Sequence, residues 1–195
     1  MAAERSLVLG TRNPHKVREI ERLLAPAGFV VTPLAAGIEL PPETGETFEA
    51  NALPKARTAA AATRQAAIAD DSGIEAPTLG GRPGVRSARY AGPEASDEQN
   101  LEKLMREAPP GSRLRYVCAL AYVDPASGRE EVFFGFCEGR LAPEPRGAGG
   151  FGYDPAFLPD ELDDGRTMAE LSDQEKDEIS HRGKAVRAFV RWLAK

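Results

Sequence analysis

One short stretch constrains this chain more than any other. Small apolar residues at 66–69 predict a buried strand, and directly after them come Asp70, Asp71, Ser72 and Gly73. Two adjacent carboxylates at the end of a strand repel each other unless a positive charge lies between them, and a divalent metal ion is a common solution. A surface turn is the alternative, because Asp, Ser and Gly are ordinary turn formers. The stretch therefore predicts either a metal site or a turn.

The length and the charge of the chain limit what it can bind. A chain of 195 residues, 42% of them hydrophobic, is long enough for one sizeable core, so we expect a single domain over residues 1–195. Its net charge of -5 argues against a nucleic-acid partner and against an acidic membrane surface. Any polyanion must therefore be bound by local positive charge.

Neither targeting nor redox chemistry is indicated. Residues 1–4 lack a basic start followed by an apolar stretch, and no apolar run approaches ~18 residues, so we expect no signal peptide, no membrane span and a cytoplasmic location. Cys118 and Cys137 lie in separate strand-like runs without metal-ligand spacing. They are predicted to be small buried residues in a reducing compartment.

The first strand, at residues 6–9, leads into a polar turn before a helix, whose apolar residues repeat with helical spacing. Free backbone N–H groups at a helix N-terminus favour an anion. Thr11, Asn13 and Lys16 would add side-chain donors, so the turn is interpreted as a phosphate cradle, although Walker spacing is absent. The alternative is an Asn-capped helix with a solvated lysine.

A helix is predicted at residues 48–65, after a loop rich in breakers and carboxylates that contains Glu43. Thr47 is the expected N-cap. Pro54 lies inside this helix and predicts a kink or a late start, because proline removes a backbone hydrogen bond. Lys55 follows directly.

Strands are also predicted at residues 29–34, 113–123 and 131–138, the last two joined by a strong turn signal at 124–128. The strands at 113–123 and 131–138 are expected to form a long hairpin. Two pairs of residues have the spacing of a capping box, which predicts the start of a helix: Ser96 with Gln99, and Ser172 with Glu175.

The last third of the chain carries aromatic and basic residues. Phe151 and Tyr153 lie in a glycine-rich loop, a composition that suits stacking on a flat ring or, alternatively, anchoring of the loop by packing. Lys176 lies in the first turn of one predicted helix, and His181 and Arg182 precede the last helix. They could donate hydrogen bonds to a ligand or form an ordinary surface pair.

Six blocks share one order with a known family. They are Thr11, Asn13 and Lys16; Glu43, Thr44 and Gly45; Ala69 to Gly73; Ser87 to Gly92; Gly150 to Pro155; and Ser180, His181 and Arg182. With these blocks the chain closely resembles the inosine/xanthosine triphosphate pyrophosphatase family of house-cleaning nucleotidases, over essentially its whole length.

The resemblance implies an α/β fold with a long central mixed β-sheet flanked by helices, and two lobes with a cleft between them. It also implies a homodimer and Mg²⁺-dependent hydrolysis of ITP, dITP and XTP to the monophosphate and pyrophosphate, which cleanses the nucleotide pool and prevents incorporation into DNA and RNA.

The resemblance also implies roles for individual residues. Asp71 would accept the proton of the attacking water, and Glu43, Asp71 and Asp70 would form the metal site. The expected substrate-binding residues are Thr11, Arg12, Asn13, Pro14, His15, Lys16, Lys55, Ser72, Phe151, Gly152, Tyr153, Asp154, Lys176, His181 and Arg182. His181 and Arg182, as donors, would suit a base with a carbonyl at position 6 and disfavour adenine.

Two other functions remain open from the residues alone. A phosphatase or phosphoryl-transfer enzyme could use one of the paired aspartates as nucleophile. A nucleotide-sensing module without turnover could use the same pocket as a switch.

Overall fold

The computed structural model describes residues 5–195. Residues 1–4, on which the expected lack of a signal peptide rests, lie outside the described residues. The strands are β1 (Arg5–Leu9), β2 (Phe29–Pro33), β3 (Ala67–Glu75), β4 (Arg113–Asp124), β5 (Arg129–Leu141) and β6 (Phe157–Pro159). The α-helices are α1 (Pro14–Leu24), α2 (Phe48–Thr63), α3 (Asp97–Glu107), α4 (Asp173–Ile179) and α5 (His181–Leu193).

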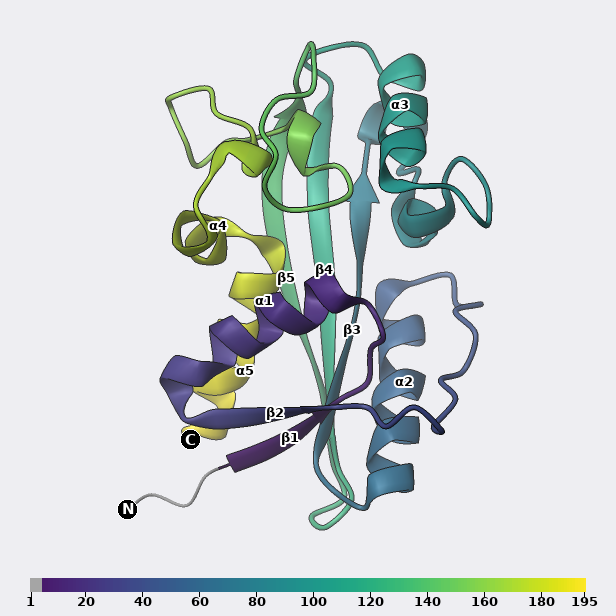
Figure 1. Cartoon of the computed structure of the whole chain (residues 1–195), viewed down its shortest axis with the longest axis vertical. Helices are drawn as coiled ribbons and strands as arrows, with labels where there is room; N and C mark the ends of the chain where they lie inside the picture. Colours follow the sequence, from purple (N-terminus) through teal and green to yellow (C-terminus); the bar gives the residue numbers. More distant parts are fainter. Residues whose placement is uncertain (1–4) are drawn as a thin grey trace. The chain divides into compact units, whose positions relative to one another are not determined.

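The strands form one mixed sheet in the order β2-β1-β3-β4-β5-β6 (Figure 1). β1 runs parallel to β2 and to β3, with Val8 opposite Ala67 and Leu9 opposite Ile68, whereas β5 and β6 are antiparallel. The expected α/β fold with a central mixed sheet flanked by helices is therefore confirmed.

The described chain divides into two compact units. The first contains residues 5–71, 118–135 and 182–195, and the second contains residues 72–117 and 136–181. The division falls within β3, β4 and β5. Two units agree with the expectation of two lobes, and the cleft between them stays a prediction.

The first unit has a core of buried aliphatic and aromatic side chains, including Leu9, Ile20, Ile68, Leu120 and Phe189. The side chains of this core come from β1 to β5 and from α1 and α5, which lie on one side of the strands while α2 lies on the other (Figure 1). Burial of such side chains is the main stabilising term of the unit.

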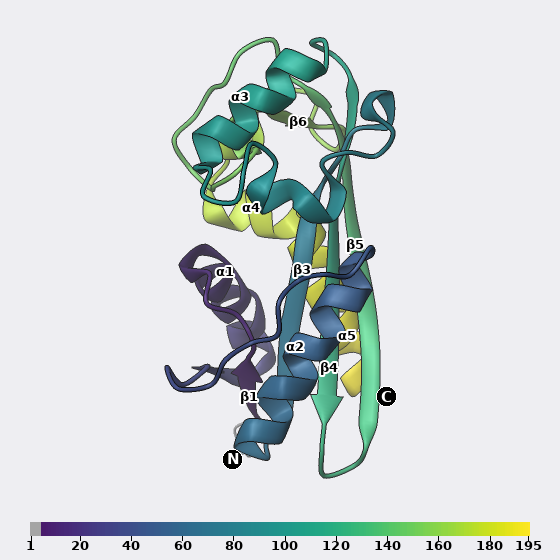
Figure 2. The same cartoon turned by 90° about the vertical axis from the view of Figure 1, so that its right-hand side faces the viewer.

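The second unit has its own core, which includes Ile74, Leu104, Leu114, Tyr116 and Phe157. Its helices α3 and α4 and the short strand β6 are seen from a second side in Figure 2. Cys137 is buried in this core and Cys118 in that of the first unit, both as free thiols, as predicted.

The local helix signals are confirmed. The side chain of Thr47 accepts a hydrogen bond from Ala50 N at the start of α2. Both predicted capping boxes are present, one at the start of α3 and one at the start of α4. These caps satisfy N–H groups that have no partner within the helix.

Some expectations about element bounds were wrong. His181 and Arg182 do not precede the last helix but are its first two residues. β3 does not end at Ala69 but continues to Glu75, so the two aspartates lie in the middle of a strand and not in a turn. α2 begins at Phe48 although it contains Pro54, so the late start is also wrong. The cap at its start and its buried alanines offset the cost of the proline.

Among residues 5–195 we find no helix with the length and apolar character that a membrane crossing requires.

Candidate active site

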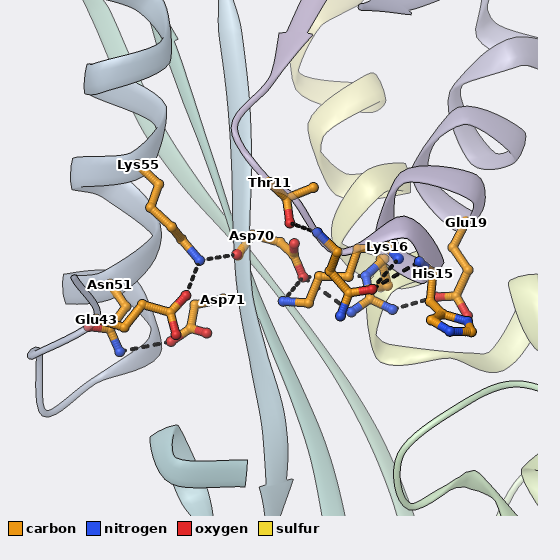
Figure 3. A network of polar contacts seen from close by, with 11 residues as sticks. Thr11, His15, Lys16, Glu19, Glu43, Asn51, Lys55, Asp70 and Asp71 are labelled. Atoms are coloured by element: carbon orange, nitrogen blue, oxygen red, sulfur yellow. Dashed lines mark hydrogen bonds and ion pairs between the residues drawn. The ribbon is translucent and has the colours of Figure 1, made fainter. Parts of the chain in front are cut away.

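Asp70 and Asp71 are neighbours on β3, and their side chains point to opposite faces of the sheet, because side chains alternate along a strand. Figure 3 shows Asp71 directed toward Asn51 and Asp70 toward Lys16. Of the three carboxylates expected to bind a metal ion, Glu43 lies on the same side of β3 as Asp71, whereas Asp70 faces the other side. The metal site itself stays a prediction.

Asp70 is completely buried and is bound by two cations of the first unit. Its Oδ2 atom lies 3.0 Å from Lys16 Nζ, and it accepts hydrogen bonds from Arg182 Nη2 (3.2 Å) and Nε (3.3 Å). Burial alone would raise the pKa of Asp70, but the charges of Lys16, Arg182 and Lys55 together lower it. Asp70 is therefore an ionised carboxylate whose Oδ2 atom is bound by Lys16 and Arg182.

Arg182 is also buried, with 1% of its side chain exposed. Its Nη1 donates to Oε2 of Glu19 on α1, so the guanidinium lies between two carboxylates. Burial opposes its charge, and Asp70 and then Glu19 raise its pKa. Arg182, which was expected to contact a base together with Lys176 and His181, binds Asp70 and Glu19 in the structure.

Asp71 is held on the other face by Asn51 of α2. The Nδ2 atom of Asn51 donates to Oδ2 of Asp71 (2.9 Å), and its Oδ1 accepts from Gly45 N (2.7 Å). A side chain at position 45 would collide with Asn51, since an added Cβ would lie 2.7 Å from that same Oδ1 atom. One buried amide thus fixes both Asp71 and the loop that carries Glu43.

Lys55 of α2 contacts both Glu43 and the backbone of β3. Its ammonium donates to Oε1 of Glu43 (2.5 Å) and to the backbone oxygen of Asp70 (2.7 Å). Burial works against its charge, but Asp70, Glu43 and Asp71 together raise its pKa. Lys55 is therefore a buried, charged ammonium beside Glu43 and Asp71.

The pKa of Asp71 is raised. Burial is the largest cause, the charges of Lys16 and Lys55 oppose it, and the negative charge of Glu43 adds to the rise. A raised pKa makes Asp71 a better proton acceptor than an exposed aspartate.

The turn between β1 and α1 is built around Asn13. Its Oδ1 accepts hydrogen bonds from the backbone nitrogens of His15 (2.9 Å) and Lys16 (3.3 Å), with Pro14 at the first helical position. The capped-helix alternative is therefore right for Asn13. It is wrong for Lys16, which pairs with Asp70 instead of remaining solvated.

Two residues of this turn have structural partners. Arg12 donates through Nη2 to the carbonyl oxygens of three loop residues, Ala35, Ala36 and Ile38. The Nδ1 atom of His15 lies 2.9 Å from Arg18 Nη2. Arg12 thus holds the loop after β2 against the turn.

A second polar group lies in the second unit and is centred on Asp154. Oδ2 of Asp154 accepts from Lys176 Nζ (2.7 Å) and from the backbone nitrogen of Phe151 (2.9 Å). Its Oδ1 accepts from the hydroxyl of Tyr116 (2.9 Å). Asp154 and Lys176 are both buried, so this is a desolvated ion pair with additional hydrogen bonds.

The aromatic residues of this group differ in exposure. Tyr153 is buried and donates its hydroxyl to the backbone oxygen of Ser87 (2.8 Å). Phe151 is half-buried, with the ammonium of Lys176 5.2 Å from its ring centroid. Tyr153 therefore serves as the packing anchor of the loop, and Phe151 is the ring available for stacking.

Comparison with known proteins assigns the family. The model of the Ham1 family matches residues 7–192. The chain belongs to the Ham1 family. It is 51% identical over 188 residues to a protein named dITP/XTP pyrophosphatase from Symbiobacterium thermophilum. The aligned region covers 94% of this chain and 92% of that protein. It is 43% identical to a protein of the same name from Bacillus subtilis, with 99% of each chain covered.

Solved Ham1 structures have the same fold. A HAM1 protein from Coxiella burnetii superimposes with a TM-score of 0.84 at 37% identity, covering 97% of this chain and 98% of that one. A structure from Mycobacterium abscessus, titled nucleoside-triphosphatase / dITP/XTP pyrophosphatase, has a TM-score of 0.73 at 40% identity, with 94% and 98% covered.

The two units of this Ham1 chain hold different parts of the sequence-predicted site. In the first unit are Thr11, Arg12, Asn13, Pro14, His15, Lys16, Glu43, Lys55, Asp70, Asp71 and Arg182. In the second are Ser72, Phe151, Gly152, Tyr153, Asp154, Lys176 and His181.

Sequence reasoning missed three polar residues at these sites. Asn51 is on the buried face of α2, Glu19 is one helical turn after Lys16 on α1, and Tyr116 is in an apolar run of β4. A polar side chain on an otherwise apolar buried face was the available signal, since such groups are hydrogen-bonded in folded proteins.

Proposed function

We propose that this Ham1 chain is a nucleoside triphosphate pyrophosphatase that hydrolyses dITP, ITP and XTP to the nucleoside monophosphate and pyrophosphate. The observation that carries the proposal is the arrangement of Lys16 and Lys55 around Asp70 and Asp71 on β3. It supplies the buried ammonium of Lys55 and the partly buried ammonium of Lys16 for a polyanion on a protein with net charge -5, next to a carboxylate that can accept a proton. The names of the relatives support the same activity.

Mg²⁺ is the proposed cofactor, with Glu43 and Asp71 as its protein ligands. Among residues 5–195 no group of three or more Asp, Glu, His or Cys side chains could hold a metal ion, so an all-protein cage is not available. A pair of carboxylates fits Mg²⁺, which commonly binds one or two carboxylates together with phosphate oxygens and water. When bound, the ion supplies charge neutralisation and Lewis-acid polarisation of a phosphoryl oxygen. Asp70 is left out of this proposed site because Lys16 and Arg182 bind it.

The proposed reaction is attack of water on the α-phosphorus. The oxygen of water forms a bond to the α-phosphorus, the bond to the bridging α–β oxygen breaks, and pyrophosphate leaves. Asp71 is proposed to orient the water and to accept its proton. A bound Mg²⁺ would lower the pKa of Asp71 and would therefore favour the orienting role. Lys16 and Lys55, with Thr11 and Asn13 of the turn, bind the phosphates and neutralise the leaving group.

Base recognition is proposed for the second unit. Phe151 stacks on the base, and Gly152, Tyr153 and Asp154 form the loop that carries it, with Lys176 and His181 as further contacts. Arg182 is kept as a proposed donor to the carbonyl at position 6, in addition to its bonds to Asp70 and Glu19. Such donors favour hypoxanthine and xanthine over adenine, because a buried donor left without an acceptor costs about 1–3 kcal/mol.

The proposal also includes the number of domains, the oligomeric state and the location of the protein. We propose one catalytic domain over residues 1–195, since the family match spans residues 7–192. We further propose a homodimer in the cytoplasm, where nucleoside triphosphates are made and used, that removes deaminated purines before they enter DNA or RNA. Neither nucleic acid nor a membrane is a proposed partner.

Hydrolysis of dITP in ¹⁸O-labelled water tests the proposal. The expected products are pyrophosphate and dIMP in equal amounts, with the label in dIMP. Label only in released inorganic phosphate would indicate the phosphatase alternative. No turnover of dITP, ITP or XTP with Mg²⁺ would indicate the sensing alternative.

A further inference from the structure

Tyr116 contacts two residues of the proposed base site. It is a buried residue of β4 with 6% of its surface exposed, and it belongs to the second unit. Its hydroxyl donates to Oδ1 of Asp154 at 2.9 Å. Its ring stacks on the imidazole of His181, with centroids 4.6 Å apart and planes 5° from parallel. One side chain therefore fixes the carboxylate of Asp154 and the plane of His181.

The hydroxyl of Tyr116 remains a donor. Burial, and then the charge of Asp154, raise the pKa of Tyr116 well above its ordinary value. A tyrosine whose pKa is raised keeps its proton and can donate it to a carboxylate in a hydrogen bond. The Tyr116–Asp154 bond is thus a charge-assisted bond inside the core.

Asp154 in turn fixes the loop that precedes it in the sequence. Its other oxygen, Oδ2, accepts from the backbone nitrogen of Phe151 and from Lys176 Nζ. The loop packs closely on the same oxygen, since a Cβ at Gly150 would lie 2.1 Å from it. A rotation of the Asp154 carboxylate would therefore move the backbone of Phe151.

We propose that Tyr116 is a positioning residue for base recognition, which sets His181 by stacking and sets Phe151 through Asp154. The inference rests on the proposed function, and it concerns the base alone. Tyr116 acts through these residues and does not itself contact the substrate.

Tyr116→Phe is the decisive variant, because it removes the hydroxyl and keeps the ring on His181. Loss of one bond to a buried carboxylate is expected to raise the KM for dITP and the Kd for dIMP by about tenfold. The kcat for dITP is expected to stay within about twofold, as for an interaction made equally in the ground and transition states. The inhibition constant of inorganic tripolyphosphate, which has no base, is expected to stay unchanged.

Tyr122→Phe is the matched control. Tyr122 lies on the same strand, has the same 6% exposure and packs its ring against Phe189 and Trp192. It should keep the wild-type Kd for dIMP. Tyr116→Leu, which removes the stacking as well, should weaken dIMP binding further than Tyr116→Phe.

Different results would contradict the inference and the proposed function. A wild-type Kd for dIMP in Tyr116→Phe would overturn the inference, as would an equal loss of affinity for dIMP and tripolyphosphate. No turnover of dITP, ITP or XTP by the wild-type protein would overturn the proposed function.

Discussion

Lys16 and Arg182 bind the same oxygen, Oδ2 of Asp70, from helices at opposite ends of the sequence. Lys16 lies in the first turn of α1, and Arg182 is the second residue of α5. Glu19 binds Arg182 from α1, so two cations and two carboxylates alternate in the core of the first unit. This network fixes the ammonium of Lys16 against Asp70 of β3.

Asp71→Asn should abolish nearly all turnover while the protein stays folded. The substitution removes the proposed proton acceptor, a role worth about 10²–10⁴-fold in rate. It also removes one of two neighbouring negative charges, which repel each other. The measurements are kcat for dITP with Mg²⁺ and the melting temperature. Glu131→Gln, at an exposed position of β5, is the control. A kcat equal to that of the wild type would show that Asp71 has another role.

Asp70→Asn should act on stability as well as on activity. It leaves Lys16 and Arg182 buried with one counter-charge fewer, which costs about 3–5 kcal/mol in comparable buried pairs. Glu130→Gln is the control, because its pair with Arg57 is half exposed (53% and 37%) and such pairs contribute under about 1 kcal/mol. Chemical denaturation compares the two variants, and equal losses would contradict a stabilising role for the buried network.

Metal dependence tests the proposed Mg²⁺ site at Glu43 and Asp71. Removal of divalent ions with EDTA should stop dITP hydrolysis, and Mg²⁺ should restore it, since Glu43 and Asp71 are the proposed ligands. Mg²⁺ should raise the melting temperature of the wild type and of the Glu131→Gln control, and have less effect on Asp71→Asn. Full turnover in EDTA would exclude the proposed cofactor.

Arg182→Ala tests whether Arg182 reads the base. Loss of the guanidinium should lower stability, because Asp70 and Glu19 lose their shared cation. The ratio of kcat/KM for ITP to that for ATP is independent of the folded fraction, and it should fall by about tenfold if a donor to the base is lost. Glu19→Gln, which keeps the guanidinium, should retain the ratio. One common ratio for all three proteins would restrict Arg182 to binding Asp70 and Glu19.

Gly150→Ala tests how closely the aromatic loop packs on Asp154. Both Gly150 (φ +69°) and Gly165 (φ +71°) have left-handed backbones, so alanine at either site costs about 1 kcal/mol or more. Only at Gly150 would the added Cβ also collide with Oδ2 of Asp154, because nothing lies within 4 Å of the one at Gly165. Gly150→Ala should therefore lower the melting temperature more than Gly165→Ala does. Equal shifts would mean that the loop can move away from Asp154.

Much of the fold could be predicted from local sequence. The caps of α2, α3 and α4 and the periodicity of the strands depend on residues a few positions apart, and these predictions are confirmed. The bounds of β3 were missed because Asp, Ser and Gly favour turns locally, whereas here the strand continues as a neighbour of β4 beyond Ala67 and Ile68, the residues that pair with β1.

The sequence by itself determined the family, through the order and spacing of six blocks, and it indicated several of the polar residues around the two aspartates, but not Asn51 or Glu19. Only the tertiary structure decided which of these residues meet. Asp70 and Asp71 are adjacent in the chain but face opposite sides of β3, and Asp70 finds its partner Arg182 at a separation of 112 residues. The physical reason is burial: a charge removed from water needs an opposite charge, and the fold alone determines which distant side chain supplies it.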